Sequence, residues 1–234
     1  MELVNARLVA EGLGFPEGPI ALPDGSIICV EIRRGTLSRI SADGSISVVA
    51  PLGGGPNGAA IGPDGAVYVC NNGGFEWQDA MGFAIPGNQP ADYSGGRIER
   101  VDLSTGAVDV LYTSCGDHPL RGPNDLVFDA DGGMWFTDHG KQRPRDQDRG
   151  GIYYARPDGS EITEVVQPSD FPNGIGLSPD GRTAYVTGGN EPVGSVGPPT
   201  PPDVTSINLI TGRVEATFSI PGGAGSIFNG TSSG

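Results

Sequence analysis

The chain has 234 residues, of which 40 are glycine and 21 are proline, and it carries a formal net charge of −14 at pH 7. This acidic balance, without a purely basic cluster, argues against nucleic acid and anionic membrane surfaces as partners. The sequence has no apolar run approaching about 18 residues and does not start with a basic segment followed by an apolar one. We therefore expect no transmembrane helix, no signal peptide and a cytoplasmic location.

The first predicted elements are a strand over residues 6–13 and a hairpin that begins at Pro16. The hairpin segment, PEGPIALPDGSIICVE, places an Asp-Gly turn between two apolar runs. The same pattern returns, without gaps, from Pro56, Pro123 and Pro172. Four copies in fixed register form an internal repeat, and the prediction of the fold starts from it.

A second pair of strands is predicted after each hairpin, because apolar runs flank a turn in residues 35–50, 96–113, 151–166 and 204–219. Four antiparallel strands in each repeat of 40–67 residues are typical of propeller blades. We therefore predict an all-β chain that forms a single incomplete β-propeller domain over residues 1–234, with blades at about 15–50, 55–113, 122–166 and 171–220.

The strand predicted over residues 6–13 has no blade of its own, because each repeat already has four strands. Propellers usually close with a strand from the opposite terminus, so we expect this strand to belong to a blade beyond the four in the chain. A closed four-bladed ring is the alternative, and it leaves residues 6–13 unexplained. Residues 71–96 form a Gly-rich, aromatic insertion in the second repeat, which we expect to be a loop on one face.

The residue after the first Pro of each repeat, called position X below, is always a Glu or an Asn. The inner strand of each blade begins there, so the four side chains are expected to ring one mouth of the central channel. One carboxylate and three amides offer the oxygen ligands that Ca²⁺ takes. The alternative is that they are turn residues, because Asn often satisfies backbone groups in Asx turns. Position X is occupied by Glu17, Asn57, Asn124 and Asn173.

Each hairpin returns to the same end of its sheet fourteen residues after position X. The residues there are Glu31, Asn71, Asp138 and Thr187. They are expected either to orient the ligands at position X or to cap strand ends in solvent. For Glu31 we favour the solvent position.

Three segments that carry position X, FPEGP (15–19), GPNDLVFD (122–129) and FPNGIGLSPDG (171–181), resemble the family of regucalcin, gluconolactonase and luciferin-regenerating enzyme. The resemblance runs from about residue 6 to residue 220. It implies a six-bladed propeller, of which about four blades are present in this chain, with one divalent metal at the channel mouth. That metal is usually Ca²⁺, and Mg²⁺, Mn²⁺ and Zn²⁺ are the alternatives.

The resemblance also implies roles for individual residues. Glu17, Asn124 and Asn173 are expected to bind the metal. The family's fifth-blade Asp, often proposed as the general base, has no match in this sequence. No catalytic residue is therefore assigned.

Four residues are expected to contact the substrate. Asn124 and Asp125 match the Asn-Asp pair of the family, and Arg121 lies near a substrate-binding Arg of some members, although three residues before Asn124 rather than two. His139 follows Asp138 at the end of the third hairpin, which puts it near the predicted mouth.

The activity implied by the resemblance is hydrolysis of a sugar-acid or other small lactone by metal-polarised attack of water. The related diisopropyl-fluorophosphatase branch implies phosphotriester hydrolysis at the same metal site as an alternative. A non-catalytic propeller that binds partners through its faces is another. The oligomeric state stays open. Four aromatic residues of the insertion could roof the site or simply pack the loop: Phe75, Trp77, Phe83 and Tyr93.

Overall fold

The computed structural model describes residues 7–80, 82–169, 171–188, 203–209, 211 and 213–219. Every regular element assigned in these residues is a β strand, so the prediction of an all-β chain is confirmed. The strands form four four-stranded sheets and two two-stranded ones. The described part of the chain contains no helix of the length and apolarity needed to cross a bilayer.

The first sheet consists of β1 (Pro16–Ala21), β2 (Ile27–Glu31), β3 (Thr36–Ile40) and β4 (Ile46–Pro51). The second consists of β5 (Pro56–Ile61), β6 (Val67–Asn71), β9 (Arg97–Val101) and β10 (Val108–Tyr112). The third consists of β13 (Pro123–Phe128), β14 (Met134–Asp138), β15 (Gly150–Ala155) and β16 (Ile162–Ser169). The fourth consists of β17 (Pro172–Leu177), β18 (Thr183–Gly188), β19 (Asp203–Asn208) and β20 (Arg213–Ser219).

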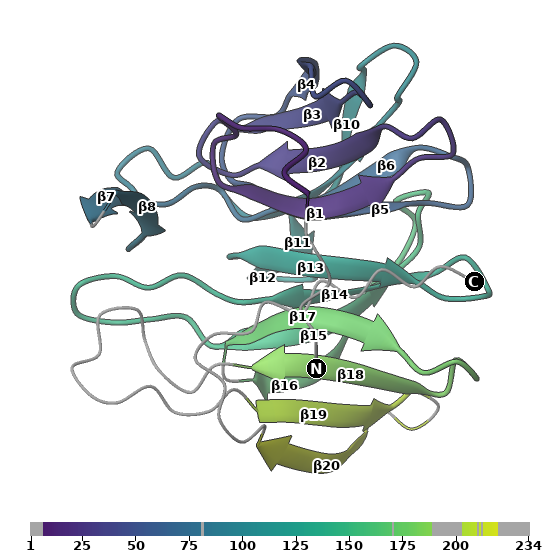
Figure 1. Ribbon diagram of the computed structural model, residues 1–234. Coiled ribbons are helices and arrows are strands. Elements are labelled where there is room, and N and C mark those ends of the chain that lie inside the picture. Colours follow the sequence, from purple (N-terminus) through teal and green to yellow (C-terminus); the bar gives the residue numbers. More distant parts are fainter. Residues whose placement is uncertain are drawn as a thin grey trace.

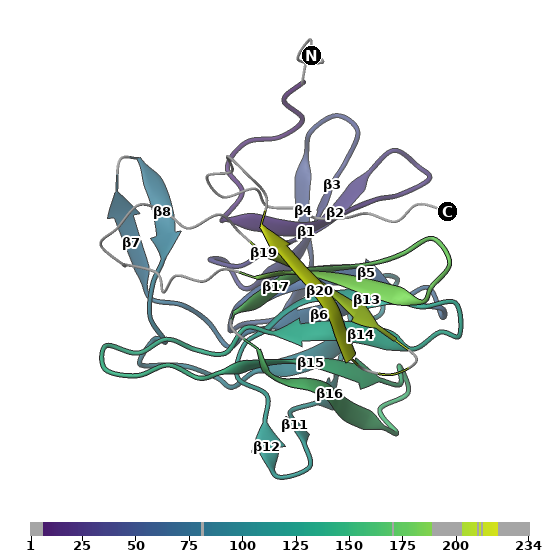
Figure 2. The same ribbon diagram turned by 90° about the horizontal axis from the view of Figure 1, so that it is seen from below.

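The two small sheets are hairpins, formed by β7 (Trp77–Ala80) with β8 (Phe83–Pro86) and by β11 (Ser114–Cys115) with β12 (His118–Pro119). The β7–β8 hairpin lies inside the insertion at 71–96, which is therefore not the plain loop that we predicted. Figure 2 shows this hairpin standing apart from the four large sheets.

The four large sheets follow one another as propeller blades do. The first strand of each sheet packs against the first strand of the next, so β1, β5, β13 and β17 form the inner side of an arc (Figure 1). Within each sheet the remaining strands follow outward in chain order. Antiparallel meanders of this kind, repeated around an axis, are the construction of a β-propeller.

Three hydrophobic cores fill the spaces between successive sheets. Neighbouring residues of a strand point to opposite faces, so a middle strand serves two cores at once. In β6, Val67 and Val69 face the first sheet, whereas Tyr68 and Cys70 face the third. Strand β14 likewise contributes both to the core between the second and third sheets and to the core between the third and fourth sheets. The continuous apolar runs that predicted the second strand of each hairpin arise from this burial on both faces.

Glycines allow the inner strands to approach closely beside position X. A Cβ on Gly18 would lie 2.6 Å from the backbone nitrogen of Ala59, and a Cβ on Gly58 would lie 2.6 Å from the carbonyl oxygen of Asn124. Both distances are too short for any other residue. The Gly that follows Glu17 and Asn57 is therefore needed for packing between blades as well as for turn geometry.

The prediction of a strand over residues 6–13 is wrong for residues 7–13, the part of that segment that the structure describes. Its backbone is bound to the first sheet in other ways. Arg34 donates from Nη2 to the carbonyl of Gly12 at 2.6 Å, and Gly14 donates its N–H to Glu31 Oε2 at 2.6 Å. Apolar alternation alone does not make a strand when no partner strand is available to pair with it.

The fourth hairpin differs from the other three by one residue. The first three turns close from the fifth to the ninth residue after position X, as in Leu22 N to Ser26 O, whereas the fourth closes from Ser178 N to Thr183 O. As a result Pro172 pairs with Gly188, while Pro123 pairs with Asp138. The four segments align without gaps in sequence but not in pairing, so Thr187 is not the structural equivalent of Asp138.

Candidate functional site

Position X lies in a bulge in the second, third and fourth blades and directly before one in the first, where Glu17 still pairs with Val30. Two residues of the inner strand there face one residue of the second strand, which turns their side chains out of the regular ladder. Bulges of this kind are frequent beside active sites, so the repeat marks position X as a candidate site. The irregular steps are Glu17–Ile20 in β1, Pro56–Ala59 in β5, Pro123–Leu126 in β13 and Pro172–Ile175 in β17.

Asn124 is the most informative side chain at position X. It is 9% exposed, yet its amide has no hydrogen-bond partner among the residues that the structure describes. The oxygen and nitrogen of this amide are not among the fully buried polar atoms without a partner, so both reach solvent. The amide of Asn124 is therefore open to a ligand on the inner side of the arc.

Glu17 lies within electrostatic reach of the residue next to Asn124. Burial raises the pKa of Asp125 to about 6, hydrogen bonds from the N–H groups of Ile175 and Leu126 oppose the rise, and the negative charge of Glu17 adds to it. Glu17 belongs to the first blade and Asp125 to the third. The two side chains are therefore close enough for their charges to interact.

Asp125 links the third blade to the fourth. Its Oδ2 accepts a hydrogen bond from Ile175 N at 3.1 Å, and its Oδ1 accepts one from Leu126 N at 2.9 Å. Thr137 completes the link, because its hydroxyl donates to the carbonyl of Asn173 at 2.6 Å. Asp125, a predicted substrate contact, is placed by these bonds where it fixes the backbone around Asn124 and Asn173.

The other two position X residues are more accessible. Asn173 is exposed and Asn57 is half-buried. The carbonyl of Asn173 is held by Thr137, so its backbone position is defined while its amide stays open to solvent. No role is assigned to Asn57 beyond its place in the repeat.

The donor set at position X fits a hard divalent cation. The described residues contain no group of three His, Cys, Asp or Glu side chains placed to hold a metal. A metal here would rely on Glu17 together with amide and backbone oxygens, which Ca²⁺ accepts. Zn²⁺ prefers sulfur and nitrogen ligands, so it suits the set less well.

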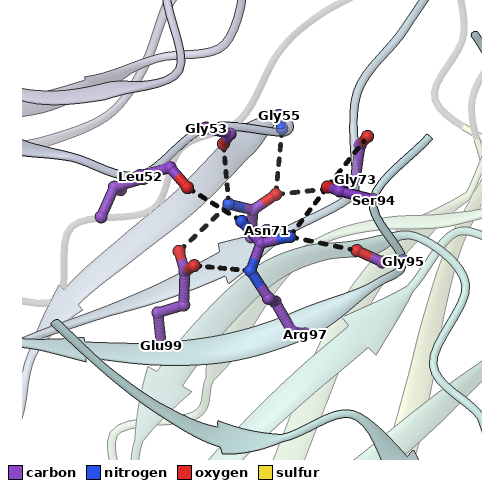
Figure 3. A network of polar contacts seen from close by, with 9 residues as sticks. All are labelled: Leu52, Gly53, Gly55, Asn71, Gly73, Ser94, Gly95, Arg97 and Glu99. Carbon is purple, nitrogen blue, oxygen red and sulfur yellow. Dashed lines mark hydrogen bonds and ion pairs between the residues drawn. The ribbon is translucent and has the colours of Figure 1, made fainter. Parts of the chain in front are cut away.

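In the first three blades, the side chain fourteen positions after X accepts hydrogen bonds from the loop that leads to position X, and we call this residue the corner of the blade. Asn71 Oδ1 accepts hydrogen bonds from Gly55 N at 2.9 Å and Gly73 N at 3.1 Å, and its Nδ2 donates to Gly53 O and to Glu99 Oε2, both at 3.0 Å. Figure 3 shows these contacts, with the Arg97 guanidinium extending the network from Glu99 to neighbouring backbone carbonyls. Every polar atom of the Asn71 amide is used within the protein.

Asp138 repeats this arrangement in the third blade. Its Oδ2 accepts from Arg121 N at 2.7 Å, and its Oδ1 accepts from Gly122 N at 2.7 Å and Gly140 N at 2.8 Å. Burial raises the pKa of Asp138 against the effect of these donors. The corner fixes the loop that leads to Asn124. Glycines flanking the corner in both blades, Gly55 and Gly73 or Gly122 and Gly140, are the sequence signal for it.

Glu31 is the corner of the first blade, and its predicted place in solvent is wrong. It is 0% exposed. Its carboxylate accepts hydrogen bonds from Gly14 N and Ser38 Oγ, both at 2.6 Å, and pairs with Arg34 Nη1 at 2.7 Å. A charge at a strand end stays buried when donors from the preceding loop and the next strand surround it.

Arg121 lines a cavity of about 360 Å³ on the outer side of the third blade's lead-in loop. None of the residues at position X lines it. Tyr93 of the insertion donates its hydroxyl proton to the Arg121 carbonyl at 2.5 Å, so the backbone of Arg121 is held on both sides. The full lining consists of Asp117, His118, Pro119, Arg121, Asp138, Asp148, Arg149 and Tyr153.

His139 is partly buried against the ring of Phe171, with the ring centroids 5.1 Å apart. Within the described residues its Nδ1 has no hydrogen-bond partner. Burial, aided by the positive charge of Lys141, lowers the pKa of His139 to about 4, so the imidazole is neutral at neutral pH. The unused Nδ1 is itself fully buried, so the ring can meet a ligand only through its partly exposed surface.

Lys141 is a buried feature that no pattern in the sequence reveals. It is 2% exposed. Its Nζ donates to Asn72 Oδ1 at 3.0 Å and to Gly74 O at 2.6 Å, and it lies 3.8 Å from the ring centroid of Phe75. All three partners belong to the insertion, so Lys141 joins the insertion to the loop after β14.

Two curated proteins illustrate the similarity of the whole sequence. Lactonase drp35 of Staphylococcus aureus (strain bovine RF122 / ET3-1) is 28% identical over 192 residues, which cover 80% of this chain and 50% of that protein. Lactonase drp35 of Staphylococcus saprophyticus is 28% identical over 189 residues with the same coverage. The chain thus spans about half the length of the curated relatives it matches.

Solved structures agree on the fold. A gluconolactonase from Xanthomonas campestris superposes with a TM-score of 0.63 at 23% identity, covering 89% of this chain and 64% of that one. A putative gluconolactonase superposes with the same TM-score at 20% identity, covering 92% and 66%. The family model described as the SMP-30/Gluconolactonase/LRE-like region matches residues 15–192, which include the first three four-stranded sheets and the inner pair of strands of the fourth. The chain therefore belongs to the SMP-30/gluconolactonase/LRE-like family.

Proposed function

We propose that the protein is a metal-dependent hydrolase that opens a small lactone, with Ca²⁺ as its metal. The observation that carries the proposal is the amide of Asn124, which belongs to a largely buried residue, has no partner among the described residues and stays accessible at a bulge that repeats in every blade. The names of the relatives, which are lactonases and gluconolactonases, support the reaction type.

Glu17, Asn124 and Asn173 would hold the metal through a carboxylate and two amide oxygens. A bound Ca²⁺ would supply Lewis-acid polarisation of the lactone carbonyl. The chain's other residues set up the site: Asp125 fixes the backbone of Asn124 and Asn173, and Asp138 fixes the loop before Asn124.

Substrate contacts belong to the same proposal. His139 would contact the substrate through its partly exposed ring, beside Phe171. Arg121 would approach the substrate from the neighbouring cavity. The side chains of His139 and Arg121 come from loops at the same end of the third blade as Asn124.

The four sheets would belong to a propeller of six blades, because the chain covers 64% of a solved gluconolactonase chain, close to four blades of six.

The protein would act in the cytoplasm. Its three cysteines are free, and Cys29 and Cys70 are buried as small apolar residues, which suits a reducing compartment.

The activity test is a titrimetric assay of acid release from simple δ-lactones, with Ca²⁺ and with a chelator. We expect Ca²⁺-dependent turnover, and a fall of at least about tenfold in kcat/KM for Asn124→Leu. The matched control is Asn57→Leu, which changes the same position in a blade without an assigned role. Turnover that persists in chelator, or faster cleavage of a phosphotriester than of any lactone, would refute the proposal.

A further inference from the structure

Two phenylalanines stand in an unusual backbone conformation beside the proposed metal ligands. Phe15 has a φ of 59° and Phe171 a φ of 47°, and each lies two residues before position X. In the second and third blades the same position is a glycine, Gly55 or Gly122, and neither of these has a positive φ. A bulky residue with positive φ is rare, and glycine adopts such angles without strain.

The strained backbone indicates that the side chains of Phe15 and Phe171 have a function. Each Phe precedes a proline, which excludes the right-handed helical region but leaves extended conformations open. The chain nevertheless takes the left-handed region at both places. Strain of this kind, retained in a bulky residue, points to a role for the side chain in the site nearby.

Phe15 is one part of an aromatic surface formed with the insertion. Its ring lies 5.2 Å from that of Trp77, and Trp77 lies 6.3 Å from Phe75 in an edge-on arrangement. All three side chains are partly exposed. Figure 1 shows that the β7–β8 hairpin, which begins at Trp77, projects from the end at which β1 begins.

Phe171 forms a second aromatic surface with His139. Both side chains are partly exposed, and the His139 imidazole is tilted by 48° against the Phe171 ring. Phe171 lies two residues before Asn173, as Phe15 lies two residues before Glu17. The first and fourth blades, which carry these two proposed ligands, are thus the blades with an aromatic ring at this position.

We propose that Phe15 with Trp77, and Phe171 with His139, are specificity surfaces that select lactones with an apolar alkyl or aryl substituent over polyhydroxylated sugar lactones. This inference rests on the proposed hydrolase function and names its substrate class. Aromatic faces bind apolar groups by area and by ring packing. A sugar ring would need polar partners for each hydroxyl, and leaving such hydroxyls unpaired against aromatic faces weakens binding strongly.

The test compares two lactones in the presence of Ca²⁺, one bearing a phenyl group and one polyhydroxylated. Phe15→Gly and Phe171→Gly remove the ring and supply the residue that suits the backbone angle. We expect the wild type to prefer the phenyl lactone by at least about tenfold in kcat/KM, and each variant to lose about tenfold on that substrate alone. Phe128→Leu, which changes a Phe at the far end of β13, should leave the preference unchanged.

A second measurement separates this inference from the proposed function. The phenyl lactam, in which an amide replaces the ester, binds without being opened, and its affinity is read by calorimetry for the wild type, Trp77→Ser and Phe15→Gly. Weaker lactam binding in both variants supports the inference, even if neither lactone is hydrolysed. Lack of hydrolysis by itself would refute only the proposed hydrolase function. Equal hydrolysis of the two lactones, or lactam binding that is absent or unaffected by the variants, overturns the inference.

Discussion

Single residues of the same type take two different roles at one end of each blade. The amide at position X in the third blade, Asn124, has no partner in the described part of the chain, whereas the amide of Asn71 uses every polar atom within the protein. Residue type does not separate the two roles. The separation follows from the bulge, which turns position X out of the ladder, while the corner residue stays in register opposite the Pro.

The corner role predicts a loss of stability. Asn71→Ala removes four hydrogen bonds and leaves their buried partners unsatisfied, so we expect the free energy of unfolding to fall by about 2–4 kcal/mol in urea denaturation. Thr187→Ala is the control, because its hydroxyl makes a single 3.4 Å contact with Gly174 O. A loss in Asn71→Ala no larger than in the control would contradict the corner role.

Among the elements, the insertion is joined to the third blade by the buried contacts of Lys141 and one exposed hydrogen bond, and to the first blade by an exposed ion pair and a ring contact. On the third-blade side, Lys141 binds Asn72 and Gly74, and the Tyr93 hydroxyl binds the Arg121 carbonyl. On the first-blade side, the exposed ion pair between Arg33 and Asp79 adds little to the Phe15–Trp77 contact. The base of the insertion is thus fixed more firmly than its hairpin.

Lys141 gives the insertion a pH-dependent stability. Burial lowers its pKa to about 7, although Asp138 and Asp148 favour its charge. Between pH 7 and the ordinary lysine pKa the unfolded chain binds a proton that the folded chain lacks, so stability contributed by Lys141 rises with pH. We therefore expect the wild type to gain about 1–2 kcal/mol of unfolding free energy relative to Lys141→Met when the pH is raised from 7 to 9.

That difference is measured by urea denaturation of both proteins at each pH, so that shared titrating groups cancel. His139 and Tyr93 are the other titratable groups near Lys141, and both are kept in the variant. A difference that stays constant or moves the opposite way would show that Lys141 keeps its proton throughout this range.

At the scale of the whole molecule, the features readable from sequence are those set by local chemistry. The Asp-Gly turns predicted the four inner hairpins, and their glycines do adopt positive φ, as in Gly25 and Gly132. The apolar runs predicted the strands shared between two cores. The expectation that the side chains at position X converge came from strand direction alone, and it stays a prediction.

The features that sequence reasoning missed depend on contacts from elsewhere in the chain. Residues 7–13 form no strand because their backbone binds the first sheet through Arg34 and Glu31. Glu31 is buried because its donors come from three separate segments. The shift in the fourth hairpin depends on one additional turn residue, and Lys141 meets its partners only through the docking of the insertion.

The central claim, that position X binds a metal, is tested most directly by calorimetric titration of Ca²⁺ into this chain. We predict one bound Ca²⁺ per chain, with affinity reduced by about tenfold or more in Glu17→Gln. The charge-matched control is Asp43→Asn, which changes an exposed turn carboxylate that binds Ser45 and should leave the affinity unchanged. Absence of binding, or equal affinities in the two variants, would contradict the account.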